Sequence, residues 1–324
     1  MHKTPRLLNA RRLTALVALA FLASCSGSGC GNCTVPAFNA TPVPGTTPTP
    51  TPGITPTPTP SITPTPLPTP ATLSCSQGAA AIPLGPALAP FALLAGATIT
   101  NVGNTLVTYA PAAVTGSFND DLIGVSPGTA VTGFYPPGTV TDGPNAIYAA
   151  GYNTNAAVPL AAENALTTAY NVAAGTPATA TVAGDLSQAS SPGFPTGTLP
   201  AGVYKSTSSL SIAAGNLTLD GGGNNQSVFI FQMGSTLTTT LNGTVSGNII
   251  LQNGASPCNI YWQVGSSATL GGTTFYGNVL AFSSVTINAT HFTGRALAGG
   301  PTLGDGSVSI PIIAGSLITN PGGQ

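Results

Sequence analysis

Residues 266–282 read SSATLGGTTFYGNVLAF, and residues 283–299 repeat that pattern without a gap as SSVTINATHFTGRALAG. Eight of the paired positions are identical, Thr269 and Thr286 among them. A short fixed period built from β-branched residues, small residues and glycine is typical of a solenoid, in which each coil of chain stacks on the next. Equivalent side chains of successive coils then lie directly above one another, so the repeat predicts an ordered lattice on the surface.

The same alternation recurs in five short segments, which flank small or aliphatic residues with hydroxyl residues. These segments are Ser209–Ile212, Thr236–Thr239, Ser267–Leu270, Ser284–Ile287 and Ser307–Ile310. Since successive side chains of a strand point to opposite faces, we expect an inward column of Leu210, Leu237, Ala268, Val285 and Val308. The outward positions form two hydroxyl columns, with copies about 4.8 Å apart along the stack. One column is Ser209, Thr236, Ser267, Ser284 and Ser307, and the other is Ser211, Thr238, Thr269, Thr286 and Ser309.

Other segments indicate the remaining sides of the coil. Two segments have apolar residues on both faces of the predicted strand, namely Val228–Gln232 and Asn259–Gln263. A strand that is apolar on both faces is covered on both faces. Apolar residues at helical spacing, followed by Gly175, predict a helix from about 159 to 173 that covers this second face. A third strand set, 247–250, 277–280 and 294–297, would complete a roughly triangular coil.

The amino terminus has the features of an export signal. Four basic residues precede a ten-residue apolar run, Leu13–Leu22, which is too short to span a bilayer as a helix. The run ends in Leu22–Cys25, which resembles a bacterial lipoprotein signal and would make Cys25 a lipidated first residue. The alternative is an ordinary signal peptide that is cut near the same place, which would release a secreted protein.

Composition divides the rest of the chain into three parts. After the signal, residues 1–25, comes a Cys-rich segment, 26–33, and then a Thr-Pro-rich linker, 34–72, whose prolines favour extended polyproline II. We expect the folded domain to span 73–324. Five cysteines fit an exported protein, and the possible disulfide partners are Cys30, Cys33, Cys75 and Cys258.

Charge is sparse beyond the signal. The basic residues Lys205 and Arg295 stand against Glu163 and six aspartates, so this part carries a charge of 2 − 7 = −5. Nucleic-acid affinity depends mainly on lysine and arginine, so a nucleic-acid partner is excluded.

The sequence contains no catalytic constellation. The only close acid pair, Asp120–Asp121, falls in a stretch that indicates a solvated loop, and neighbouring strand residues point to opposite faces. His291 occupies the repeat position of Thr274, which predicts an outward coil residue. Asp220 begins a Gly-rich segment that predicts a coil turn. We therefore expect neither an enzyme, a metal site nor a cofactor.

Several motifs in order resemble the DUF3494 ice-binding family. They are Gly124–Gly133, Ala201–Tyr204, Val228–Gln232, Asn259–Ser266, Gly277–Leu280 and Gly294–Ala298. The resemblance implies a mainly β fold, namely a discontinuous right-handed parallel β-solenoid of triangular cross-section with one long helix packed alongside. It also implies ice or ordered water as the partner and inhibition of ice growth or recrystallisation.

The family's Thr-rich motif is only loosely kept here, in Leu241–Thr244, Gly271–Thr274 and Asn288–His291, at the corner after the hydroxyl columns. These stretches add Thr244, Thr273, Thr274 and Thr290 to the candidate ice-binding residues, and Thr240, directly before the first stretch, is a further candidate. The sequence thus predicts a monomeric ice-binding protein, exported to the outer membrane or cell surface on a Cys25 lipid anchor. It would inhibit ice growth or recrystallisation, or attach the cell to ice. Alternatives are an adhesin or glycan-binding module, which could use the aromatic Phe134–Tyr135 loop, and a purely structural envelope protein.

Overall fold

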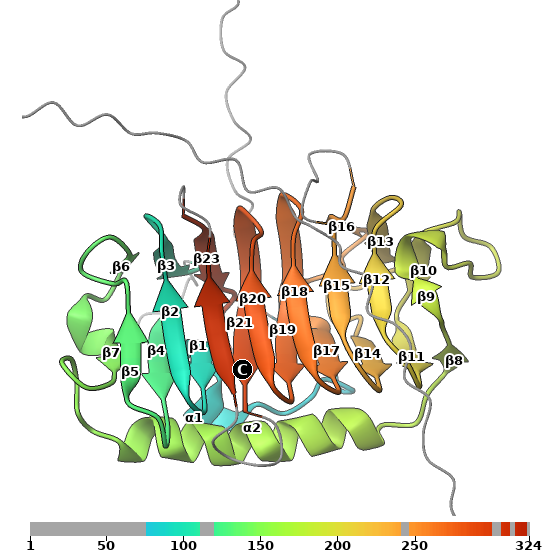
Figure 1. Cartoon of the computed structure of the whole chain (residues 1–324). Coiled ribbons are helices and arrows are strands. Elements are labelled where there is room, and N and C mark those ends of the chain that lie inside the picture. Colours follow the sequence, from blue (N-terminus) through green and yellow to red (C-terminus); the bar gives the residue numbers. More distant parts are fainter. Residues whose placement is uncertain (1–75, 111–119, 241–245, 300–305, 312–314, 323–324) are drawn as a thin grey trace, which may run out of the picture. The chain divides into compact units, whose positions relative to one another are not determined.

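The computed structural model describes residues 76–110, 120–240, 246–299, 306–311 and 315–322. Cys25, Cys30, Cys33, Cys75 and Thr244, like the expected signal and linker, lie outside the described residues. The described chain is a parallel β-solenoid with three faces and one long helix (Figure 1). Every named strand pair is parallel, as expected for coils stacked in one direction.

The first face, called the helix-side face, lies next to the long helix α2 (Ala157–Gly175). Its strands, in spatial order, are β8 (Ala180–Thr181), β11 (Gly202–Ser206), β14 (Phe229–Met233), β17 (Ile260–Val264), the second halves of β19 (Thr274–Ala281) and β21 (His291–Ala298), β1 (Phe91–Ala95), β4 (Leu122–Val125) and β7 (Ile147–Tyr148). Both sides of β14 and β17 are buried, as their unbroken apolar sequence predicts.

The second face, called the hydroxyl face, contains the five predicted ladder segments in one eight-stranded sheet. Its strands, in spatial order, are β9 (Gly184–Asp185), β12 (Leu210–Ile212), β15 (Leu237–Thr239), β18 (Ser267–Leu270), β20 (Ser284–Ile287), β22 (Ser307–Ile310), β2 (Thr98–Asn101) and β5 (Ala130–Thr132).

The third face completes the triangle. Its strands are β10 (Thr198–Pro200), β13 (Leu217–Asp220), β16 (Ile249–Gln252), the first halves of β19 and β21, β23 (Leu317–Asn320), β3 (Leu106–Tyr109) and β6 (Thr139–Val140). Short helical segments occupy connections and ends: α1 (Gly85–Leu88), η1 (Pro144–Ala146), η2 (Leu186–Gln188) and η3 (Pro257–Asn259).

One expectation about the faces is wrong. Residues 277–280 and 294–297 do not join 249–252 on the third face, because Asn278 pairs with Tyr261 and Val279 with Trp262 on the helix-side face. The chain turns from one face to the other at Gly277, within β19. There φ is 115°, and a Cβ atom would lie 2.7 Å from Ile260 Cγ2, so the turn requires glycine.

The solenoid is discontinuous in sequence. β1 pairs with β21, β2 with β22 and β3 with β23, so an amino-terminal coil stacks on the last carboxy-terminal one (Figure 1). Buried Arg295 ties this seam together. It donates to the Ala89 carbonyl at 2.8 Å and to Asn278 Oδ1 at 2.9 Å.

The helix packs where the sequence predicts, although it extends two residues further at each end than the expected 159–173. Gln232 Nε2 donates to the carbonyls of Ala173 and Thr176 at 2.7 Å. Gln263 Nε2 donates to the Tyr170 hydroxyl at 2.8 Å. These glutamines occupy one register row of β14 and β17, and they satisfy polar groups along the buried helix face.

Candidate functional site

The hydroxyl face has the in-register columns that the repeat predicts. Ser211 lies beside Thr238, and Thr238 beside Thr269. Thr269 lies beside Thr286, and Thr286 beside Ser309. The parallel column runs from Ser267 through Ser284 to Ser307, and Ser209 and Thr236 continue it immediately before β12 and β15.

An aliphatic column holds this lattice from beneath. Leu210, Leu237, Ala268, Val285 and Val308 are each no more than 1% exposed, which confirms their predicted inward direction. Protein interiors are packed almost as densely as organic crystals, so the outward side chains stand on a support that resists deformation. The face is therefore both regular and stiff.

Hydrogen bonds between coils orient several of the hydroxyls. Thr236 Oγ1 donates to Ser209 Oγ at 2.9 Å, and Ser284 Oγ donates to Ser267 Oγ at 2.9 Å. In the second column, Ser309 Oγ donates to Thr286 Oγ1 at 3.1 Å. These bonds fix the direction of the hydroxyls without removing them from the surface, because a hydroxyl has one donor and two acceptor sites.

Thr238 and Thr269 differ from these pairs. Neither hydroxyl bonds to a protein group in the described part of the chain, although both lie in register at the middle of the face. Their stiff χ1 angle holds a methyl and a hydroxyl in a defined orientation. These two threonines offer full hydrogen-bonding capacity to an external lattice.

The structure separates the remaining candidate residues. Thr240, Thr273 and Thr290 lie at the corner that follows the hydroxyl face. Thr240 Oγ1 donates to the Ala213 carbonyl at 3.1 Å. Thr274 lies on the third face, where it is paired with His291. The fifteen candidate residues therefore do not all share one plane.

Sequence reasoning missed the amino-terminal part of the hydroxyl face. Thr98 lies beside Ser307 and Thr100 beside Ser309, and Thr132 in turn lies beside Thr100. All three threonines are exposed. The signal was present, because Thr98-Ile-Thr100 has the same alternation as Ser307-Val-Ser309. However, this segment lies far from the repeat in the sequence, so the period of the repeat does not reach it.

An acidic side chain closes the other end of the hydroxyl face. Asp185 lies beside Ser211, and its carboxylate accepts hydrogen bonds from the amides of Ser187, Ala213 and Ala214 at 3.0, 3.1 and 2.7 Å. Burial opposes ionisation of this group, but the hydrogen bonds prevail and lower its pKa below the ordinary value. The coil at the β9 end of the hydroxyl face thus carries an ionised carboxylate at the position where the neighbouring coils carry hydroxyls.

Among the acidic residues that the structure describes elsewhere, Asp121 differs from the expectation. The expectation of a solvated Asp120–Asp121 loop is wrong for Asp121, which is fully buried just before β4. Its Oδ2 accepts a hydrogen bond from the Asp142 amide at 3.0 Å. Burial, with a further contribution from the Asp142 charge, raises the pKa of Asp121 to about 6.

The other predicted features are placed as follows. His291 is an exposed outward residue, and Asp220 caps a turn at Gly222 and Gly223, both of which have positive φ. Cys258 is disulfide-bonded, and its partner lies outside the described residues. Phe134 is 3% exposed, which removes it from the suggested aromatic binding loop.

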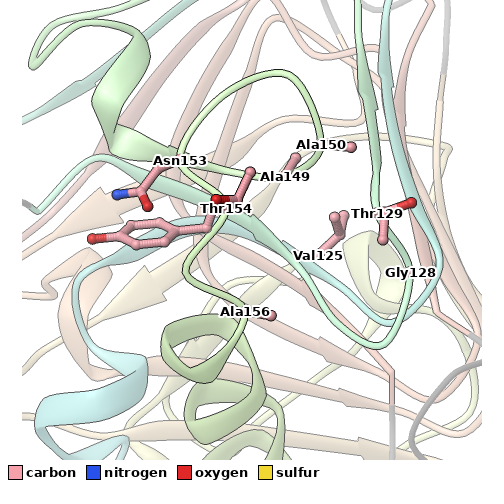
Figure 2. Close-up of a pocket in the computed structure, with 9 residues that line it drawn as sticks. Val125, Gly128, Thr129, Ala149, Ala150, Asn153, Thr154 and Ala156 are labelled. Atoms are coloured by element: carbon pink, nitrogen blue, oxygen red, sulfur yellow. The ribbon is translucent and has the colours of Figure 1, made fainter.

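Neither a metal cluster nor a membrane-spanning helix is found among the described residues. No group of three or more histidine, cysteine or acidic side chains comes together there, and no described helix is long and apolar enough to cross a bilayer. A pocket of about 160 Å³ lies beside the start of α2. Figure 2 shows its lining, which is mostly alanine, threonine and glycine and contains no acid, histidine or cysteine.

The described solenoid thus carries a regular face of in-register hydroxyl columns with little charge, supported by a buried aliphatic column. The chain belongs to the Ice-binding-like family, whose profile matches residues 93–308. This confirms the resemblance in the sequence and the β-solenoid fold with one long helix.

Individual relatives agree with the family assignment. The chain is 38% identical over 212 residues to an ice-binding protein of Nostoc sp. (strain HG1), a match that covers 64% of this chain and 66% of the relative. It is 44% identical over 103 residues to Ice-binding protein 1 of Shewanella frigidimarina (strain NCIMB 400), covering 31% of this chain and 11% of that much longer protein. The crystal structure of an ice-binding protein from an Antarctic biological consortium superposes with a TM-score of 0.58 at 33% identity, covering 76% of this chain and 94% of that one.

Proposed function

We propose that this chain adsorbs to ice through the hydroxyl face and thereby inhibits ice growth or recrystallisation. The observation that carries the proposal is the pair of in-register hydroxyl columns, one of which has Thr238 and Thr269 at its middle. The family and its named ice-binding relatives support the same function.

The physical argument concerns rigidity and weak contacts. Ice presents a flat, periodic array of water molecules, so a binding surface must match it over many positions at once. Each threonine contributes a small methyl contact and a hydrogen bond, and a preorganised plane makes these contacts with little further loss of entropy. Ionised side chains hold their own hydration tightly, so the scarcity of charge on this face also favours adsorption.

The test is partition of the full chain into slowly growing ice. We expect the wild type to be enriched in the ice fraction and the Thr238→Tyr/Thr269→Tyr variant to lose enrichment about tenfold, equivalent to roughly 1.4 kcal/mol. Thr168→Tyr, on the exposed side of α2, is the matched control and should bind as the wild type does. Exclusion of the folded wild type from ice would refute the proposal.

We also propose that the protein acts at the cell surface as a monomer, without catalysis. A lipid on Cys25 would anchor it, and the Thr-Pro-rich residues 34–72 would act as a spacer that lets the ice-binding domain, residues 73–324, reach a crystal. Radiolabelled palmitate incorporation should disappear in Cys25→Ala. Incorporation that is absent from the wild type would instead favour the secreted alternative, with an ordinary signal peptide.

A further inference from the structure

Two acidic side chains meet at one corner of the end coil, which we define as the circuit from Asp121 to Asp142. Asp121 directly precedes β4, and the chain then passes through β5 and β6, one strand on each face, before it reaches Asp142. The two residues are 21 positions apart in sequence, and the Asp142 amide donates to Asp121 Oδ2 at 3.0 Å. The start and the finish of the end coil are therefore in direct contact at the corner between the third face and the helix-side face.

Each of these carboxyl groups has a buried oxygen without a hydrogen-bond partner among the described residues. The two oxygens are Asp121 Oδ1 and Asp142 Oδ2. Asp121 is fully buried, whereas Asp142 is half-buried and so borders solvent. The two carboxyl groups are close enough to interact through their side chains and their charges. Because an ionised group that is buried without a partner is very costly, the pair requires a compensating proton or cation.

Neither a proton nor a basic side chain of the described chain supplies this compensation near neutral pH. Burial raises the pKa of Asp121 only to about 6, so its proton is mostly lost at pH 7 and above. Beyond the signal, the lysine and arginine residues are Lys205 and Arg295. Lys205 is exposed in β11, near the opposite end of the solenoid. Arg295 lies at the seam, and the aspartate whose charge acts on it is Asp120.

The same corner is satisfied in other coils. Asn278 Nδ2 donates to the carbonyls of Cys258 and Ile260 at 3.2 and 3.1 Å, and Asn320 Nδ2 donates to the Ala89 carbonyl at 3.2 Å. Buried polar groups are nearly always paired, and an unpaired one commonly marks strain, a functional role or a bound ion or water. The end coil differs from these coils because its corner carries two carboxyl groups in place of neutral amides.

Calcium fits this corner best among the common divalent cations. It is bound through carboxylate oxygens, one or two from each group, and it tolerates irregular geometry with waters completing the coordination. Magnesium demands near-ideal octahedral geometry and gives up its waters reluctantly, which suits a site with a fully buried ligand less well. The half-buried Asp142 leaves a solvent side from which waters complete the shell, and the double charge of the ion neutralises both carboxylates.

We propose that Asp121 and Asp142 bind one calcium ion, which ties the start of the end coil to its finish. The proposal does not depend on adsorption to ice. With two acidic ligands the affinity is modest, with a dissociation constant on the order of 0.1–1 mM, as in extracellular calcium modules. The same coil carries Thr132 beside Thr100 at the edge of the hydroxyl face, so the ion also steadies that end of the face.

The test is thermal unfolding of the full chain at pH 7, followed by circular dichroism after treatment with EDTA. We expect about 10 mM CaCl2 to raise the Tm of the wild type by about 3–10 °C, and NaCl of equal ionic strength to raise it far less. Asp121→Asn and Asp142→Asn should lose the response. In EDTA, Asp121→Asn should be at least as stable as the wild type, so that its lost response does not reflect misfolding. Asp220→Asn, which removes a carboxylate from a turn outside the end coil, is the control and should respond as the wild type does.

Amide hydrogen exchange locates the effect. Calcium should slow exchange in residues 121–142 of the wild type and leave residues 198–220 unchanged. The proposal is overturned if calcium alters neither the Tm nor the exchange of the wild type, or if either variant of the pair keeps the response and so places the ion elsewhere. A response that is also lost in Asp220→Asn would indicate a general effect of charge and overturn it too. Ice partition of the wild type in EDTA tests the proposed function separately, since the hydroxyl columns contain neither aspartate.

Discussion

Glu163 provides a sharp test of how the helix is docked. It lies in α2 and is fully buried, and neither carboxyl oxygen has a hydrogen-bond partner. A Cβ atom added at Gly299 would lie 2.4 Å from Glu163 Oε2, so the carboxyl group packs directly over that glycine. Burial raises the pKa of Glu163 from its ordinary value of 4.5 to about 8.

The sign of the effect follows from proton binding. The folded protein holds the Glu163 proton more tightly than the unfolded chain does, so the associated stability is fully present below pH 4.5 and is lost as the pH rises through 8. One pKa unit corresponds to about 1.4 kcal/mol. At pH 7, which is 2.5 units above the ordinary value of 4.5, the unfolded chain has released this proton and the folded protein retains it. Protonating Glu163 in the folded state therefore lowers the free energy of unfolding by about 3 kcal/mol at this pH.

Glu163→Gln keeps the shape of the neutral acid and removes the titration. We expect the variant to be more stable than the wild type by about 3 kcal/mol at pH 7 and nearly equal to it at pH 4. Urea unfolding of the full chain, followed by circular dichroism at several pH values, measures both. Between pH 6 and 8 the wild type should lose about 2 kcal/mol that the variant retains.

Asn164→Asp, at an exposed position of the same helix, is the control for a nearby charge and should alter this slope little. If the free energy of unfolding changed equally with pH in the wild type and in Glu163→Gln, the reasoning would be refuted. The carboxyl group would then not be titrating from a buried, unpartnered state.

Three further outcomes follow from the packing. Asp121→Asn should raise the urea midpoint at pH 7 and leave it unchanged below pH 4, since the raised pKa of Asp121 makes ionisation costly in the folded state. Leu237→Ala removes a fully buried side chain beneath the hydroxyl face and should lower the free energy of unfolding in urea by about 2–5 kcal/mol. Partition of the same variant into ice measures whether the hydroxyl columns above the cavity still bind. Arg295→Met should cost about 1–3 kcal/mol, because Asn278 Oδ1 and the Gly322 carbonyl lose their buried donor at the seam. A variant as stable as the wild type in calorimetry would contradict this account of the seam.

Part of the fold can be read directly from the chain. The two seventeen-residue repeats predict parallel stacking and the inward column, because in a solenoid the sequence period is also the structural period. Helical spacing likewise predicts α2, and the doubly apolar segments predict the face that it covers. These are local patterns, and the contacts that they determine lie between residues one coil apart.

The candidate site is only partly predictable for the same reason. The five segments around Ser209, Thr236, Ser267, Ser284 and Ser307 lie in order along the chain, so their columns follow from the repeat. Thr98, Thr100 and Thr132 join the same columns from the opposite part of the sequence. No local pattern states which distant coil edge a given strand will meet, so this extension of the face depends on tertiary pairing.

The sequence by itself determined the family, the stacked coils and the low charge of the surface, since these are properties of composition and period. Only the tertiary structure decided that β2 and β5 complete the hydroxyl face, that Gly277 turns the chain from the third face to the helix-side face, and that Asp121 and Glu163 are buried. It also decided which hydroxyls bond to each other and which remain free. The physical reason is that burial and hydrogen bonding depend on what the far parts of the chain bring alongside, and backbone pairing between short strands is nearly independent of their side chains.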